Sequence, residues 1–179
     1  MGNWIIKFLG TAILIHGLLI WTGPEIVMRK LDRDLEAAKI FESECGERWV
    51  DGIFYINPSC LSNKQSARKL NPDFLYFLIP YDLSNGDLFV STPVPPNDRY
   101  WSIHAHNRNT DAFYRITNTE INGERFELLI TKNKNKTSDI PIAYATSKKG
   151  VILNRLVMKD FSEYKSLDIF RRSTFREYR

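Results

Sequence analysis

The residues whose types and spacing come closest to a catalytic or metal-binding pattern are His104 and His106, separated by Ala105. Residues i and i+2 of a β-strand share a face, so both imidazoles can reach one metal ion. A zinc site needs at least a third ligand, and Asp111 is the next carboxylate along the chain, in a predicted loop. The pair is the candidate metal site, but without a clear third ligand we predict no bound cofactor.

Other catalytic signatures are missing from the sequence. It has no Gly-x-Ser-x-Gly nucleophile elbow, no glycine-rich phosphate loop and no His-Glu-x-x-His helix. The net charge is +4, and the basic residues are too scattered for a nucleic-acid-binding patch. The two basic clusters, Lys132–Lys136 and Arg171-Arg172, are interpreted as solvated surface, the second within reach of anionic lipid. We therefore favour a protein that is not an enzyme and binds no nucleic acid.

Cys45 and Cys60 are the only cysteines, and they lie in a segment, 45–70, that is rich in turn residues. One disulfide between them is the first interpretation, and closing a loop of this length would stabilise the fold by about 3 kcal/mol. Such a bond forms in an oxidising compartment. The alternative is two unrelated thiols, because spacing alone does not establish proximity.

An apolar segment at residues 4–22 approaches the roughly 20 residues that a membrane-spanning helix needs. Trp4 and Trp21 bracket it, as interfacial aromatic residues do, and Lys7 can extend to the headgroups. No small-x-small cleavage site follows, which favours an uncleaved anchor at 1–23 over a signal peptide. A buried core helix is the third interpretation.

The next segment, 24–44, predicts a separate amphipathic linker helix that follows a kink at Gly23-Pro24. Its apolar residues recur at helical spacing with charges between them. They are Ile26, Val27, Leu31, Leu35, Ala38 and Phe41.

Two polar features bear on the membrane topology. His16 lies inside the apolar segment, where an imidazole most simply hydrogen-bonds a neighbouring helix. Arg29, Lys30 and Arg33 follow the segment, and the positive-inside rule, applied to them alone, would place the body in the cytoplasm.

The remainder, 71–179, predicts a mainly-β domain, an antiparallel sandwich or jelly-roll-like fold, that ends in a helix or a basic tail. Short runs rich in aromatic and β-branched residues alternate with turns such as Ser84-Asn85-Gly86. The predicted strands are Phe74–Tyr81, Leu88–Thr92, Tyr100–His106, Phe113–Thr117, Arg125–Ile130, Ile142–Ala145 and Val151–Val157. The closing helix would place Phe161, Tyr164, Leu167 and Phe170 on one face.

Five motifs in this domain resemble, in order and spacing, those of domain-of-unknown-function family 1254, over roughly residues 70–160. They are Asn71 to Tyr76, Tyr81 to Gly86, Arg99 to Ile103, Phe113-Tyr114 and Gly150 to Arg155. The resemblance implies the short type of member, a single β module behind a helix in the bacterial inner membrane. Such members face the periplasm and are encoded beside a short protein of the sister family 1214. The resemblance and the cysteine pair together favour a periplasmic body, against the cytoplasmic body that the count of positive charges indicates.

Two functions are compatible with this resemblance. The first is a membrane-anchored interaction or assembly subunit that pairs with a family-1214-like membrane protein or a larger envelope complex. The second is a cell-envelope hydrolase, or a small-ligand or lipid-binding protein, with a pocket in the β domain. Beside the histidine pair, the candidate ligand or partner residues are Asp73, Tyr76, Asp82, Trp101, Asn107 and Arg155.

Overall fold

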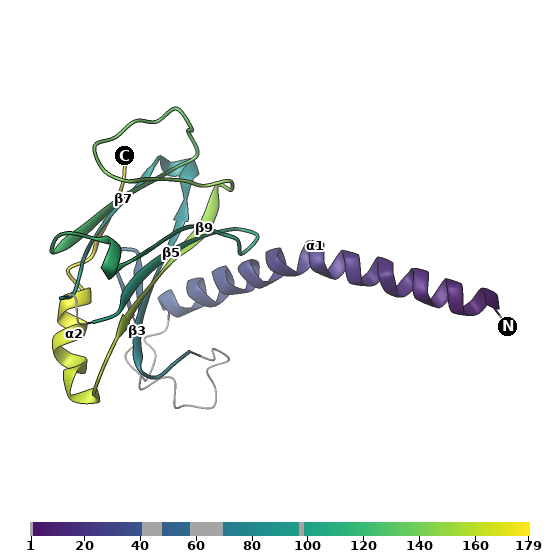
Figure 1. The fold of residues 1–179 in the computed structure, drawn as a ribbon, viewed down its shortest axis with the longest axis horizontal. Helices are drawn as coiled ribbons and strands as arrows, with labels where there is room; N and C mark the ends of the chain where they lie inside the picture. The colour runs from purple at the N-terminus through teal and green to yellow at the C-terminus, as the bar shows by residue number, and fades with distance from the viewer. Residues whose placement is uncertain (1, 41–47, 58–69, 97–98) are drawn as a thin grey trace.

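The computed structural model describes residues 2–40, 48–57, 70–96 and 99–179. In this part of the chain, ten strands form a two-layer sandwich that α1 joins from one side (Figure 1). The helices are α1 Gly2–Ile40 and α2 Tyr164–Arg171, with short 3-10 helices at Leu83–Asn85 (η2), Asn118–Glu120 (η3) and Phe161–Glu163 (η4). The strands are β1 Arg48–Val50, β2 Ile53–Ile56, β3 Phe74–Asp82, β4 Leu88–Pro93, β5 Trp101–Asn107, β6 Ala112–Thr117, β7 Arg125–Thr131, β8 Ile142–Tyr144, β9 Lys149–Val157 and β10 Phe175–Tyr178.

The strands divide into a six-stranded sheet, in the order β1-β2-β3-β9-β5-β6, and a four-stranded sheet, in the order β10-β4-β7-β8. Each described pair of neighbours is antiparallel except β7 and β8. The predicted mainly-β, antiparallel sandwich is confirmed, and each of the seven predicted strands is present.

The core lies between the two sheets and is filled by alternate residues of each strand. On β5, Trp101, Ile103 and Ala105 point inward and are at most 1% exposed, while His104 and His106 point to the opposite face. Trp101 packs edge-on against Phe126 of β7, with 6.0 Å between the ring centroids. The outward face of the six-stranded sheet therefore carries the histidine pair.

The predicted division into an anchor and a separate linker helix is wrong, because α1 runs without interruption from Gly2 to Ile40 with Pro24 inside it. A proline removes one helical hydrogen bond and bends a helix, but it need not end one. Figure 1 shows α1 as one curved rod that leaves the sandwich. The apolar half and the half that meets the domain are thus mechanically continuous.

The segment expected as a loop, 45–70, contains the hairpin of β1 and β2, which extends the six-stranded sheet. Asp51 and Gly52 turn the chain with φ of 49° and 77°, the backbone form of a two-residue hairpin turn. The expected basic tail also contains a strand, β10, which pairs with β4. Short strands of this kind gain most of their stability from pairing, which local propensity does not report.

Two of the motif residues that carry the family resemblance hold the fold together. Gly150 lies where β9 passes the end of β5, and a Cβ atom there would come within 2.1 Å of the carbonyl oxygen of His106. The guanidinium of Arg99 donates two hydrogen bonds, of 2.9 and 2.8 Å, to the carboxylate of Glu163 in η4. The hydrogen bonds from Arg99 and from the backbone N–H of Lys159 lower the pKa of Glu163 to about 2. Neither residue needs a ligand to explain its presence.

Arg171, expected on the solvated surface, is buried at 2% exposure. Its guanidinium donates to Asp168 and to the carbonyl oxygens of Ile56 and Tyr76, which joins α2 to β2 and β3. The reason for the error is that these acceptors lie 115 and 95 residues away in the sequence.

Replacing Arg171 by Ala should lower the free energy of unfolding by about 3 kcal/mol, because two buried carbonyl groups lose their donor. Urea unfolding of the full chain in detergent, followed by tryptophan fluorescence, measures the change. Lys165→Ala, on the exposed side of the same helix, is the control and should cost less than about 0.5 kcal/mol. Equal effects of the two substitutions would contradict the structural role of Arg171.

Candidate functional site

The outward face of the six-stranded sheet is divided into a half covered by α1 and a half where polar side chains are at least partly exposed. On the covered half, Met28 and Leu35 of α1 are 4% and 2% exposed and pack with Phe54, Leu78 and Val151. These three residues come from β2, β3 and β9 respectively. The helix α1 thus buries apolar side chains on the outward face of the sheet, opposite the face that packs on the four-stranded sheet.

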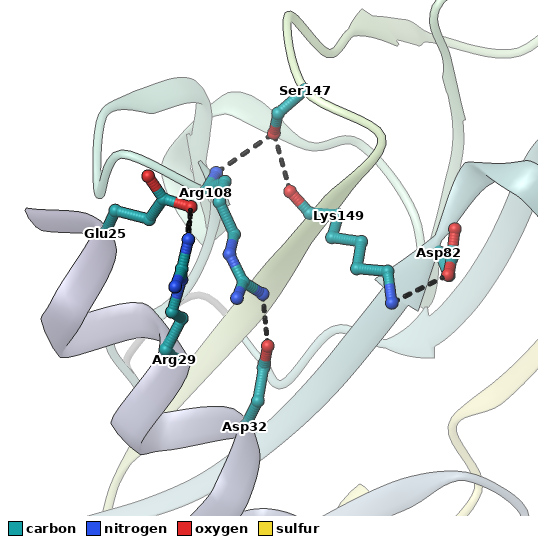
Figure 2. Close-up of polar contacts among 7 residues, drawn as sticks. All are labelled: Glu25, Arg29, Asp32, Asp82, Arg108, Ser147 and Lys149. Atoms are coloured by element: carbon teal, nitrogen blue, oxygen red, sulfur yellow. Dashed lines mark hydrogen bonds and ion pairs between the residues drawn. The ribbon is translucent and has the colours of Figure 1, made fainter.

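Polar contacts also stabilise the junction between α1 and the six-stranded sheet. Asp32 of α1 forms an ion pair with Arg108, at the end of β5, and the backbone N–H of Arg108 donates to the hydroxyl of Ser147 at 3.0 Å (Figure 2). The Ser147 hydroxyl in turn donates to the carbonyl oxygen of Lys149 at 2.6 Å. The helix is therefore connected through Arg108 to the start of β9.

A tryptophan adds a further contact between the helix and the sheet. The indole Nε1 of Trp49, on β1, donates to the carbonyl oxygen of Leu35 at 3.1 Å. The two residues face a cleft of about 440 Å³ beside the junction, together with Asp82 and Lys149.

The carboxylate of Asp82 in this cleft is already engaged. It accepts a hydrogen bond from the backbone N–H of Ser84 at 3.0 Å and lies 3.1 Å from Nζ of Lys149. The Ser84 backbone bond and the Lys149 charge lower the pKa of Asp82. A carboxylate held in its charged form by these partners caps η2 and is poorly suited to general acid catalysis.

The histidine pair shares one face, as predicted, with 6.1 Å between the ring centroids and 16° between the ring planes. Nδ1 of His106 lies 2.9 Å from the carbonyl oxygen of Thr110, a contact that requires Nδ1 to carry the proton. Burial, followed by the positive charges of Arg155, His106 and Arg115, lowers the pKa of His104. Within the described residues, no group of three or more His, Cys, Asp or Glu side chains could hold a metal ion.

A pocket of about 400 Å³ opens on the same face, at the end of β9 away from the junction. Tyr76 and Arg155, both predicted as ligand or partner residues, line it and stand opposite each other on β3 and β9. Its other lining residues are Leu70, Asn71, Phe74, Tyr100 and Leu153. This pocket brings together two of the predicted ligand or partner residues, Tyr76 and Arg155.

Trp101 and Asn107 were expected at a ligand site, but the side chains of both make structural contacts within the domain. Trp101 is in the core, because the strand alternation that turns the histidines outward turns Trp101 inward. The side-chain oxygen of Asn107 accepts the backbone N–H groups of Thr146 and Ser147 at 3.0 and 3.2 Å. Asn107 therefore holds the turn that precedes β9.

The remaining predicted residues do not line the pocket that contains Arg155. Asp73 is exposed just before β3, and its carbonyl oxygen accepts the N–H of Met158 at 2.7 Å. His16 is exposed on the apolar half of α1. Cys45 and Cys60 fall outside the described residues, so their pairing stays a prediction.

Sequence reasoning missed the contacts that position the site. Asp32 and Arg108 are 76 residues apart, and nothing in their local sequence marks them as partners. Tyr100, which is 41% exposed and lines the pocket, was predicted as the first residue of a strand and not as a site residue. Strand alternation predicts that Tyr100 and Trp101 lie on opposite faces, and the packing of the two sheets decides which face is inward.

Comparison with solved structures finds a similar fold in the crystal structure of the VPA0106 protein from Vibrio parahaemolyticus. The TM-score is 0.53 at 13% sequence identity, over 61% of this chain and 28% of that chain. An uncharacterized protein from Burkholderia cenocepacia gives a TM-score of 0.47 at 10% identity, over 60% of this chain and 31% of that one. This chain thus spans less than a third of either protein. Comparison with curated proteins yields no match.

The family relationship is closer than these distant fold similarities. The sequence model of the family described as protein of unknown function DUF1254 matches residues 54–174, from β2 to the residue before β10. The match covers most strands of both sheets and the motifs noted above, and this chain therefore belongs to the DUF1254 family.

Proposed function

We propose that this protein is a membrane-anchored subunit of the bacterial cell envelope, whose β-sandwich lies in the periplasm and pairs with a sister β-module protein. The observation that carries the proposal is the different surroundings of the two halves of α1. The N-terminal half is apolar and exposed, whereas the C-terminal half packs on the sandwich and is ion-paired to it.

The apolar half of α1 needs a covering that the described residues do not provide. Ile13, Leu14 and Trp21 are 71%, 74% and 88% exposed. By length and composition α1 is able to cross a membrane, although a signal sequence near an N-terminus meets the same criteria. The unbroken helix through Pro24 favours the anchor, because it offers no extended small-residue segment for cleavage.

The junction would hold the sandwich close to the bilayer. Met28, the first α1 residue buried against the sheet, follows Trp21 by seven positions, a rise of about 10 Å along the helix. A body held by a continuous helix has a restricted position and orientation. Such an arrangement suits a subunit that meets its partner at the membrane surface, where His16 offers a polar contact to a second helix.

Pairing with a sister module is supported by the size of the similar structure. The fold of this chain accounts for 28% of the Vibrio protein, so this architecture also occurs within a much longer chain. In the proposal, a further β module, of the kind that such a longer chain has room for, contacts this sandwich as a separate protein. The periplasmic side rests on the family resemblance and the predicted Cys45–Cys60 disulfide, against the positive charges that follow the anchor.

The full chain, expressed in bacteria, should stay in the membrane fraction after an alkaline wash and keep residues 4–22. Proteinase K added to spheroplasts should digest the β domain, because the domain would lie outside the inner membrane. Intact mass and immunoblotting measure the two outcomes. A shorter soluble chain would contradict the anchor, and protection of the domain until lysis would contradict the periplasmic side.

A native preparation in mild detergent should contain a second membrane protein in a fixed ratio to this chain. Replacing His16 by Leu should lower its recovery if the imidazole bonds a partner helix. Quantitative mass spectrometry measures the ratio, and Thr11→Val, whose hydroxyl bonds the Lys7 carbonyl within α1, is the matched control. A monomer that crosslinks to no other protein would contradict the subunit role.

The fixed junction can be tested by a double-mutant cycle on Asp32 and Arg108. Because the two side chains are 39% and 25% exposed, we expect a coupling free energy of roughly 0.5–1 kcal/mol in urea unfolding. The control cycle uses Glu25 and Arg29, a more exposed pair within α1, and should give a smaller coupling. Equal couplings would show that the Arg108 contact does not hold the helix to the domain.

A further inference from the structure

The Arg155 pocket has properties that an interaction subunit does not require. Arg155 is half-buried on β9, between Tyr76 of β3 and Ser102 of β5 in the sheet register. The volume of the pocket, about 400 Å³, lies in the range of small-molecule sites. The walls are largely apolar, from Phe74, Tyr100 and Leu153.

The guanidinium of Arg155 is not neutralised by the fold. Across the described residues, each arginine that ties elements together has a carboxylate partner or a carbonyl acceptor, as Arg99, Arg108 and Arg171 do. Arg155 has neither in this part of the chain, and no Asp or Glu lines its pocket. A half-buried guanidinium without a counter-ion favours an anion, which it can bind through two parallel hydrogen bonds.

Tyr76 supplies a second donor in the same pocket. Its side chain is only 5% exposed, and its hydroxyl oxygen accepts the backbone N–H of Asn71 at 3.1 Å. The described residues offer no acceptor for the hydroxyl hydrogen of Tyr76. A buried hydroxyl with an unused hydrogen stabilises a ligand that brings an acceptor.

The aromatic walls are organised around these two donors. Phe74 packs edge-on against Tyr100 at 5.8 Å and lies 6.0 Å from the ring of Tyr76. Such surfaces hold the aromatic or aliphatic body of a ligand, while the donors hold its charged end.

The position of the pocket favours a soluble ligand over a membrane lipid. The N-terminal end of the α1 junction lies at the corner of the sheet formed by Arg108 and Lys149, and the junction extends from there to the apolar cluster that contains Tyr76. Arg155 follows Lys149 by six residues along β9. Six residues of strand span roughly 20 Å. The pocket is therefore separated from the corner at which the anchor arrives by most of the length of the sheet.

We propose that this pocket binds the carboxylate of a small organic acid that carries an aromatic or aliphatic body. Arg155 binds the carboxylate through two hydrogen bonds, Tyr76 donates a third, and the walls of Phe74, Tyr100 and Leu153 enclose the body. The inference goes beyond the proposed subunit role and does not depend on it.

Benzoate is the first probe, and benzamide is its neutral match in size and shape. The full chain is placed in nanodiscs of zwitterionic phosphatidylcholine, and binding is measured by saturation-transfer NMR up to about 10 mM probe, above the millimolar Kd expected of so small a ligand. We expect benzoate to bind and benzamide to bind at least about tenfold more weakly. Equal binding of the two probes, or no binding of benzoate, would overturn the proposal.

Variants assign the binding to the pocket. Arg155→Gln should weaken benzoate binding by about tenfold or more, Arg155→Lys by less, and Tyr76→Phe by about threefold. Arg115→Gln, an exposed arginine on the same sheet face that does not line the pocket, is the control and should change Kd by less than about twofold. An unchanged Kd for Arg155→Gln, or an equal loss in the control, would overturn the proposal. Urea unfolding midpoints establish that each variant is folded.

A second arm separates soluble acids from lipid. In nanodiscs that contain anionic phosphatidylglycerol, benzoate should bind as it does in phosphatidylcholine. If anionic lipid displaces benzoate in wild type and in Arg115→Gln alike, the pocket binds a lipid headgroup, and the soluble ligand is excluded.

Discussion

The six-stranded sheet has apolar side chains on both faces, and the rest of the structure follows from the need to bury both. On β3, Leu75 and Phe77 point toward the four-stranded sheet, while Tyr76 and Leu78 point the other way, and all four are at most 7% exposed. A second sheet can cover only one of these faces. The C-terminal half of α1 covers much of the other, so this helix is part of the hydrophobic core.

This constraint connects the apolar half of α1 to the domain. A helix that completes the core cannot act as a flexible tether, because its release would expose Met28, Leu35 and the sheet residues beneath them to water. The ion pair between Asp32 and Arg108 adds a contact that depends on the orientation of α1, which the apolar packing alone does not provide. Whatever the apolar half of α1 is embedded in, the orientation of the sandwich is therefore transmitted from it through a continuous helix.

The side chains that could do chemistry are mostly engaged in holding this arrangement. Asp82 caps η2, Asn107 fixes a turn and Arg171 joins α2 to two strands. Among the motif residues, Asp82, Arg99 and Gly150 have such structural roles, which the fold requires whatever the function is. Arg155 and Tyr76 differ because the fold leaves the charge of one and the hydroxyl hydrogen of the other unsatisfied within the described residues.

The sequence by itself determined the class of fold, because alternation of apolar residues and turn chemistry are local properties. Seven strands, the shared face of His104 and His106 and the apolar helix could be read from it. It did not reveal β1, β2 and β10, whose stability comes from pairing with distant strands, or the continuity of α1 through Pro24. Tertiary structure alone decided that Arg171 is buried, that Trp101 is unavailable and that Asp32 meets Arg108. Each depends on partners far away in the chain, and only the packed sheets bring those partners within hydrogen-bonding or van der Waals distance.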